Sequence, residues 1–452
     1  MIKIIKTIVL GILIILCLYQ ASMMWASQLN STNSLLPTIG SLSSSLDLLD
    51  DEIYLLTPNK LGIVLDGDET KFTVIKKTSV FYASLYKESA AMLIEVMSGG
   101  DIYVEDVEVN DLFSSRSLFF TLETEISKDI LIDVFNFDQD LLEKVDYITS
   151  FGIILSENVD HVFVYLISQD QKATIYAIDS DRIDTLSDSI EFYLDQIQEN
   201  TNTLTLYDSS IFDDIDGFYK HTLLPTSDNN WGYIKELNFY KPFINIDGFI
   251  KRDVENYVNG FEPGAKWDYS QQDRIMYGND TMLITYDSQG LFQYQLFVDQ
   301  GDHNSGLVNS FIVANNFIRK DNQIKKQEFY LKNYYATDTG YVFNYGYRYN
   351  GFPIIMDSVL LERYGLGYPL VIEVSGNEVV SYERILIAME DMIPELKTYS
   401  GDYRKMLEIF DENVSPTIPI TDAFLGYYWS NEDSADMRWI IDYNRLYYSI
   451  DM

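Results

Sequence analysis

Histidines and acidic clusters are the side chains of this sequence that could support catalysis or bind metal. The three histidines, His161, His221 and His303, lie far apart, and their spacing suits no metal ion. His161 begins a predicted strand and the other two lie in polar segments, so surface or capping roles explain them better. The sequence contains no nucleophile-elbow, zinc-protease, Walker or dinucleotide-binding motif. We therefore expect neither an enzyme nor a cofactor.

Two acidic segments look like cation sites, and each has a simpler explanation. Residues 66–69 (DGDE) could hold a cation, but Asp-Gly is typical of a hairpin turn. Residues 179–184 (DSDRID) begin like a calcium-binding loop. However, Ile183 fills a ligand position, and Asp184 stands where the loop needs glycine. We predict no metal site.

The 35 tyrosines allow two interpretations. An aromatic platform could stack on cell-wall sugars, which would make the chain an anchored module that binds wall glycans or peptides. Most of the tyrosines, however, alternate along predicted strands, where tyrosine is a favoured cross-strand residue. The second interpretation accounts for their number without a ligand.

Composition and charge exclude several classes of function. With 47% hydrophobic and 14% aromatic residues, the chain can build real cores. Its single cysteine, Cys17, lies in an apolar N-terminal run, so disulfides and cysteine metal sites are excluded elsewhere. Beyond Lys3 and Lys6, 30 basic residues stand against 69 acidic ones. Such a surface repels nucleic acid and anionic lipid and keeps the chain soluble.

The N-terminal segment predicts a membrane anchor. Residues 1–7 contain Lys3 and Lys6, and the apolar residues 8–26 would form a helix of roughly 28 Å, about the thickness of the hydrocarbon core. The lysines place the N-terminus in the cytoplasm, so the later residues are extracellular. A cleaved signal peptide is the alternative, but cleavage after Ala26 would put Met24 at the −3 position, where a small residue is needed. We favour an uncleaved single-pass anchor in the cell membrane.

The remaining residues predict an α+β fold, in which a single N-terminal transmembrane helix precedes a multidomain extracellular region of antiparallel sheets with packed helices. A stalk over residues 27–47 leads to an N-terminal domain (48–200), a middle domain (201–325) and a C-terminal domain (326–452). A polar segment at 199–203 and a charged segment at 319–326 mark the boundaries.

Sequence patterns also place individual elements. They predict helices over residues 84–97, 187–198, 254–259, 307–318 and 402–410. They predict strands over residues 119–123, 161–166, 274–277, 281–286, 291–297, 329–331, 341–345 and 439–450. Asn350-Gly351 is the strongest hairpin signal, and a second hairpin surrounds residues 375–377.

Several aromatic segments carry a resemblance to a known family. They are residues 101–123, 147–155 (YITSFGIIL), 161–165, the hairpin 274–294, residues 343–353 (FNYGYRYNGFP), and residues 422–427 (DAFLGY) followed by Trp439. Together with the anchor and the thiol-free exterior, they resemble the YycH family of low-GC Gram-positive bacteria. Met437 occupies the family's proline position, and Phe352 replaces its tyrosine. The resemblance covers nearly the whole chain, and its motifs concern packing rather than chemistry.

The resemblance implies an accessory regulator of a sensor histidine kinase. Members of this family act on the WalK (YycG) kinase, which controls cell-wall metabolism, together with a sister protein, YycI, whose fold the C-terminal domain resembles. Contact with the kinase is implied to run largely through transmembrane helices. Thr7, Gly11 and Leu18 lie on one face of the predicted anchor and could pack against a partner helix, or the pattern could arise by chance. A homo-oligomer also remains open.

Overall fold

The computed structural model describes one compact unit of the chain. Unit Leu55–Met452 contains all the described residues, and the other unit, Met1–Tyr54, lies outside them. The described residues are 58, 60–65, 72–76, 79–98, 103–108, 112, 116–135, 137–155, 163–168, 172–177, 181–199, 206–209, 223–225, 230–234, 236–245, 247–261, 267–271, 273–297, 306–321, 328–391, 396–400, 403–431, 433–444 and 446–451. Within them, no helix has both the length and the hydropathy that spanning a bilayer requires. The predicted anchor and stalk fall outside these ranges.

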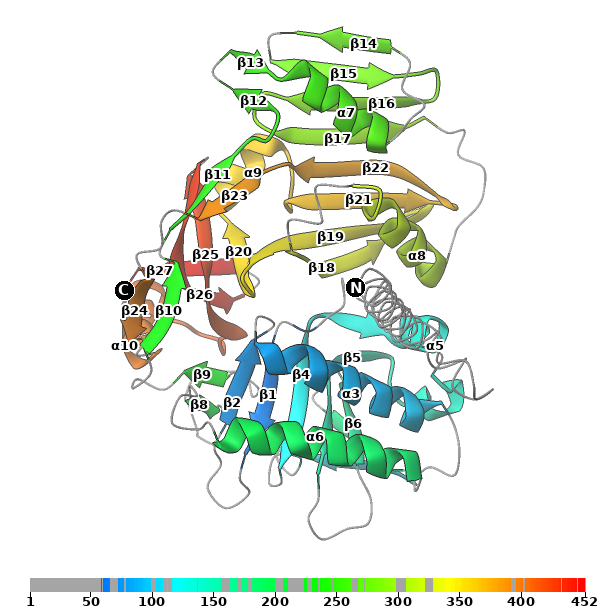
Figure 1. The fold of residues 1–452 in the computed structure, drawn as a ribbon, viewed down its shortest axis with the longest axis vertical. Coiled ribbons are helices and arrows are strands. Elements are labelled where there is room, and N and C mark those ends of the chain that lie inside the picture. The colour runs from blue at the N-terminus through cyan, green and yellow to red at the C-terminus, as the bar shows by residue number, and fades with distance from the viewer. Residues whose placement is uncertain are drawn as a thin grey trace, which may run out of the picture. The chain divides into compact units, whose positions relative to one another are not determined.

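The first sheet has nine strands in the order β3-β7-β6-β5-β4-β1-β2-β8-β9. Their bounds are β1 Lys60–Val64, β2 Phe72–Lys76, β3 Tyr103–Glu108, β4 Ser117–Ser127, β5 Tyr147–Ile154, β6 Phe163–Ser168, β7 Lys172–Ala177, β8 Leu206–Ser209 and β9 Leu223–Pro225. Helices α3 (Val80–Met97) and α6 (Asp181–Glu199) run side by side across this sheet (Figure 1). The short helices α5 (Lys128–Phe135) and η2 (Gln139–Leu142) lie between β4 and β5 in sequence.

Local sequence explains the two long helices of this sheet. The Ser79 side chain caps α3 by accepting a hydrogen bond from the backbone N–H of Phe81. Helix α6 is amphipathic, and its apolar residues Ile190, Leu194 and Ile197 are fully buried. The helices predicted over residues 84–97 and 187–198 are therefore confirmed, each a few residues longer at its N-terminal end.

The second sheet has fourteen strands in the order β14-β15-β16-β17-β22-β21-β19-β20-β25-β26-β11-β23, with β18 beside β19 and β27 beside β26. The bounds are β11 Glu236–Tyr240, β14 Trp267–Ser270, β15 Arg274–Gly278, β16 Met282–Asp287, β17 Leu291–Leu296, β18 Glu328–Ala336, β19 Gly340–Tyr349, β20 Phe352–Met356, β21 Leu370–Ser375, β22 Glu378–Ile385, β23 Ala388–Asp391, β25 Asp422–Asn431, β26 Ser434–Tyr443 and β27 Leu446–Ile450. Two small sheets pair β10 (Asn230–Ile234) with β24 (Leu396–Ser400), and β12 (Ile244–Asn245) with β13 (Gly248–Phe249).

The described helices of the second half are α7 (Lys251–Phe261), α8 (Leu307–Ile318), α9 (Ser358–Tyr364) and α10 (Tyr403–Val414). Three of these four helices were predicted, and α9 was not. Helix α8 contacts β19, β21 and β22, so a helix of the predicted middle segment packs on strands of the predicted C-terminal segment (Figure 1). Strand β17 lies before the predicted boundary between residues 325 and 326, and it likewise pairs with β22, which lies after that boundary. The division into three domains remains a prediction.

The strands are mostly antiparallel, as predicted. Strands β20 and β25, which lie far apart in sequence, form a parallel pair. Asn350 and Gly351 join β19 to β20 with φ values of 49° and 75°, which fits the tight hairpin turn that the sequence predicts. The prediction of one strand over residues 439–450 is wrong, because the chain turns at Asn444, where φ is 53°, and returns as β27.

The two departures from the family pattern pack against one core cluster. This cluster contains Trp439, Leu425, Phe410 and other residues of α10, β25, β26 and β27. Phe352 and Met437 are both partly buried against it. An apolar side chain therefore fills each position, and neither substitution leaves the cluster unfilled.

A buried ion pair joins the segment after α8 to the middle of the second sheet. The side chains of Asp321 and Arg384 are both fully buried, and the guanidinium donates a hydrogen bond to the carboxylate. The Tyr382 hydroxyl donates to the same carboxylate oxygen over 2.8 Å. The Arg384 guanidinium also lies 5.0 Å from the centre of the Phe329 ring. These contacts give each buried charge a partner, as burial requires.

A second ion pair joins β4 of the first sheet to β19 of the second. Arg348 is 1% exposed, stacks over the Tyr330 ring at 4.2 Å, and donates a hydrogen bond of 2.7 Å to Glu123. Burial alone would raise the pKa of Glu123, but Arg348, Lys332 and Lys60 outweigh it and hold that pKa below its ordinary value. Glu123 is therefore ionised at neutral pH.

We expect Glu123→Gln to lower the free energy of unfolding by about 1.5–3 kcal/mol near neutral pH, because Arg348 loses its charged partner. The folded-state pKa of Glu123 lies below the unfolded one. This contribution is therefore fully present above the unfolded-state pKa, about 4.3, and is lost as the pH falls through the folded-state value. Urea unfolding at several pH values measures the gap, which is the difference in the free energy of unfolding between the wild type and Glu123→Gln. This gap should close in acid. Glu125→Gln on the same strand is the matched control; a gap that does not change with pH would contradict the assignment.

Candidate functional site

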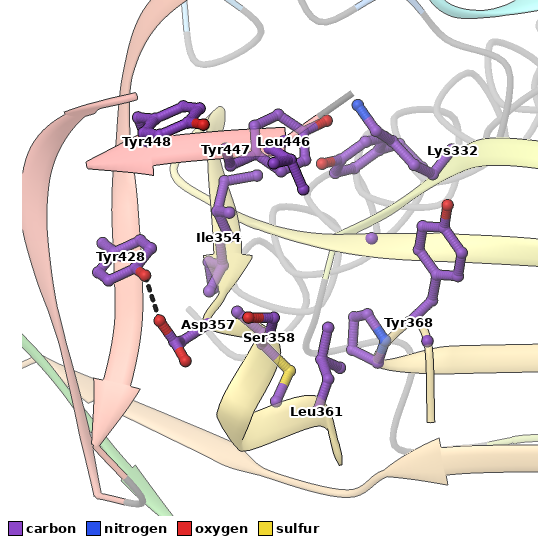
Figure 2. Close-up of a pocket in the computed structure, with 16 residues that line it drawn as sticks. Lys332, Ile354, Asp357, Ser358, Leu361, Tyr368, Tyr428, Leu446, Tyr447 and Tyr448 are labelled. Atoms are coloured by element: carbon purple, nitrogen blue, oxygen red, sulfur yellow. Dashed lines mark hydrogen bonds between the residues drawn. The ribbon is translucent and has the colours of Figure 1, made fainter. Parts of the chain in front are cut away.

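A cavity of about 430 Å³ lies where β18, β20, α9 and β27 meet (Figure 2). Five tyrosines line it: Tyr330, Tyr368, Tyr428, Tyr447 and Tyr448. Apolar side chains form much of the remaining wall: Ile354, Ile355, Met356, Leu361, Pro369 and Leu446. A cavity of this volume, mostly apolar with a few polar groups, is typical of a small-molecule site.

Glycine in β19 positions one aromatic wall of the cavity. Gly346 faces Tyr330 in the register of β18 and β19. A Cβ added to Gly346 would lie 2.5 Å from Cζ of Tyr330, so no larger residue fits beneath the ring as it lies. Arg348 covers the ring with its guanidinium. The Tyr330 ring is therefore fixed between the backbone of β19 and a buried cation.

One end of the cavity carries an ammonium group. Lys332 is the extra residue of a β-bulge, because Leu331 pairs with Tyr345 and Asn333 with Asn344. Its Nζ lies 5.0 Å from the centre of the Tyr447 ring, and Figure 2 shows the ammonium and the Tyr447 hydroxyl at the same end of the cavity. Within the described ranges, no carboxylate oxygen lies at ion-pair distance from this ammonium.

The protonation of Lys332 follows from its surroundings. Burial would lower its pKa, but the acidic groups around it, including Tyr330, Glu123 and Asp442, outweigh burial and raise that pKa. Burial has the opposite effect on the phenols: it raises the pKa of Tyr330 and Tyr447, so both hydroxyls keep their protons at neutral pH. This end of the cavity therefore presents hydrogen-bond donors and a positive charge.

At the other end of the cavity, the carboxylate of Asp357 already has hydrogen-bond partners within the protein. Asp357 caps α9 by accepting a hydrogen bond of 2.8 Å from the backbone N–H of Val359 to Oδ1. Its second oxygen accepts a hydrogen bond from the Tyr428 hydroxyl, as Figure 2 shows. Burial, together with this bond, raises the pKa of Tyr428 to about 12. The Asp357 carboxylate thus has both oxygens engaged by the protein.

A second cavity, of about 490 Å³, lies between β16, β17, α8 and the start of β22. Its polar residues are mostly neutral: Asn279, Thr281, Asn316 and Asn377. Its ammonium, Lys320, lies 5.2 Å from the centre of the Phe317 ring. The two cavities therefore share a cation over an aromatic ring, but one tyrosine, Tyr294, lines the second cavity, whereas five line the first.

Most residues that the sequence singled out lie outside the described residues. These are Thr7, Gly11 and Leu18 of the predicted anchor, the three histidines, and the turn at 66–69. Across the described ranges, no three His, Cys, Asp or Glu residues group closely enough to hold a metal ion. The expectation that the chain is not an enzyme and has no cofactor remains a prediction.

The structure separates two groups of tyrosines. Tyr165, Tyr176, Tyr286, Tyr345 and Tyr382 are fully buried, as expected of residues that build sheets. The tyrosines around the first cavity form a second group, which sequence reasoning missed. A signal was present, because Gly346 belongs to the segment 343–353 and Tyr428 directly follows the segment 422–427. Segments that sequence reasoning assigned to packing therefore also border the cavity.

Comparison with known proteins identifies the fold. No family model matches the sequence, and no curated protein matches it. Among solved structures, the chain is similar to the crystal structure of YycH from Bacillus subtilis, with a TM-score of 0.57 and 12% sequence identity. The match covers 89% of this chain and 97% of that chain. The chain has a YycH-like α+β fold, and the resemblance inferred from the sequence is confirmed at the level of the fold.

Proposed function

We propose that this chain is a membrane-anchored extracellular accessory regulator of a sensor histidine kinase that controls cell-wall homeostasis. The observation that carries the proposal is the likeness to YycH, which extends over 89% of the chain. The N-terminal sequence supports it, because an apolar segment of 19 residues precedes the folded region. The expected partners are a WalK-like kinase and a YycI-like protein, in a cell membrane that this chain crosses once.

The proposed mechanism is a shift between two states of the kinase. A single helix in the membrane can act on other helices only by packing against them. Thr7 and Gly11 form a pair of small residues on the predicted anchor, and Leu18 lies on the same face. If this face and the extracellular domains fit one kinase state better, that state gains population. A difference of about 1–3 kcal/mol changes the ratio of the states by roughly 5–150-fold.

Exchanging residues 1–30 for an unrelated anchor of the same orientation tests this proposal. We expect the exchange to abolish complementation of a deletion strain, measured as kinase-dependent transcription, while the protein still reaches the cell surface. Gly11→Leu should weaken complementation, because a large side chain at this position would keep the partner helix from approaching closely. Val9→Leu, on the opposite face of the helix, is the matched control. Normal complementation by the exchanged protein would show that the anchor is only a tether.

A second candidate function is an anchored binding module for a wall component. The observation that favours it is the tyrosine-lined cavity, whose volume of about 430 Å³ suits a small ligand. The two functions are compatible, since a bound ligand could bias the contacts of a regulator. The chemistry of the cavity narrows what that ligand can be.

A further inference from the structure

We propose that the cavity between β18, β20, α9 and β27 binds a small organic carboxylate with an apolar body, of the kind found at the C-terminus of a short peptide. The carboxylate would lie at the end that holds Lys332 and Tyr447, and the apolar body would lie along Met356, Leu361 and Leu446. This inference goes beyond the proposed regulatory function and does not require it.

The donor end supplies the first argument. Lys332 is a cation at a β-bulge, a backbone feature that often re-aims a side chain next to a functional site. The hydroxyls of Tyr330 and Tyr447 have no hydrogen-bond partner among the described residues, and both line the cavity with Lys332. An ammonium and two phenol groups that lack acceptors within the described part of the chain match the oxygens of one carboxylate.

The charges around Lys332 do not prevent this binding. Glu123 is ion-paired with Arg348 at 2.7 Å, so its charge is already compensated. Asp442 and Asp422 also help to raise the pKa of Lys332, and burial together with Asp422 raises the pKa of Asp442. These groups keep Lys332 protonated without closing an ion pair with it in the described structure. A ligand carboxylate could make that contact without displacing a protein group.

The remaining wall argues for an apolar body rather than a sugar. A buried sugar needs hydrogen-bond partners for its many hydroxyl groups, because an unpaired polar group is costly to bury. Here Asp357 already uses both oxygens, for Val359 and Tyr428, which leaves Ser358 as the other short polar side chain at that end. No arginine lines the cavity among the described residues, although arginine is preferred for phosphate.

The test compares a carboxylate with its uncharged amide. The probes are N-acetyl-Ala-Leu with a free C-terminal carboxylate and the same peptide as the C-terminal amide, titrated into the full-length protein in detergent by calorimetry. We expect the carboxylate to bind at least tenfold more tightly than the amide, and Lys332→Met to remove this preference. Tyr447→Phe, which deletes one hydroxyl, should weaken binding of the carboxylate several-fold.

Matched variants keep the test decisive. Lys320→Met removes the same charge from the other cavity and should preserve the preference for the carboxylate. Lys332→Arg keeps the charge and should retain part of the preference, which separates lost charge from lost folding. Equal binding of the two probes, a preference that survives Lys332→Met, or no binding of the carboxylate at millimolar concentration would each overturn the proposal. These results are independent of complementation, so they leave the regulatory function to its own test.

Discussion

Replacing Asp321 by alanine is expected to lower the free energy of unfolding by about 3–5 kcal/mol. The change removes the carboxylate that pairs with Arg384, and both side chains are fully buried. Burial would lower the pKa of Arg384, but Asp321 and the tyrosines around it raise that pKa well above its ordinary value. The variant removes the largest of these raising effects, but a guanidinium keeps its proton in proteins, so the variant must bury a charge without its carboxylate. Urea unfolding of the full-length chain, followed by circular dichroism, measures the loss.

A double variant distinguishes the contribution of the ion pair from the cost of leaving one buried charge unpaired. Asp321→Leu combined with Arg384→Met replaces both charges with apolar side chains, and replacement of a whole buried ion pair is often neutral. We therefore expect the double variant to be more stable than Asp321→Ala. If Asp321→Ala unfolds within about 1 kcal/mol of the wild type, below the range expected for a broken buried pair, the carboxylate does not hold this part of the sheet.

Trp439→Ala is expected to lower the free energy of unfolding by about 3–5 kcal/mol, because it deletes the largest side chain of the cluster that joins α10 to β25, β26 and β27. Trp439 pairs with Leu425 on one side and with Ile450 on the other. Its indole N–H has no acceptor within the described residues, so the expected loss comes from packing. Trp439→Phe keeps most of the apolar volume and should lose clearly less.

An exposed aromatic residue provides the control for this prediction. Phe297 is 56% exposed, so Phe297→Ala should change stability by less than about 0.5 kcal/mol. The same urea titration compares the three variants. A loss for Trp439→Ala no larger than that for Phe297→Ala would mean that the cluster around Trp439 closes over the missing ring without a cavity.

Helices and turns could be predicted wherever a short stretch of the sequence carries their spacing or turn residues. Helix α8 begins and ends where the spacing of Leu307, Phe311, Ala314 and Ile318 places it. The turn at Asn350-Gly351 was equally visible, because its two positive φ values suit asparagine and glycine. The strand over residues 439–450 was not resolved into two, because Asn444 supports the turn at φ 53° without a glycine beside it.

Contacts between residues far apart in the chain could not be predicted from the sequence. Residues 319–326 look like a charged boundary, yet Asp321 is buried because Arg384 and Tyr382 complete its hydrogen bonds from β22. The cavity was missed for the same reason. Its walls come from separate segments, which meet only through pairings such as β20 with β25 and β26 with β27. Lys332 and Tyr447 show no relation in sequence.

Strand β11 has a consequence for how the chain is made. It ends at Tyr240, but its partners, β23 and β26, begin only at Ala388 and Ser434. A nascent chain that emerges N-terminus first must therefore hold β11 with both edges unpaired until much of the remaining sequence has been synthesised. Such high contact order makes folding slow and exposes the intermediate to aggregation. A premature stop before residue 434 would leave β11 without β26, so truncation near the C-terminus also damages structure that begins two hundred residues earlier.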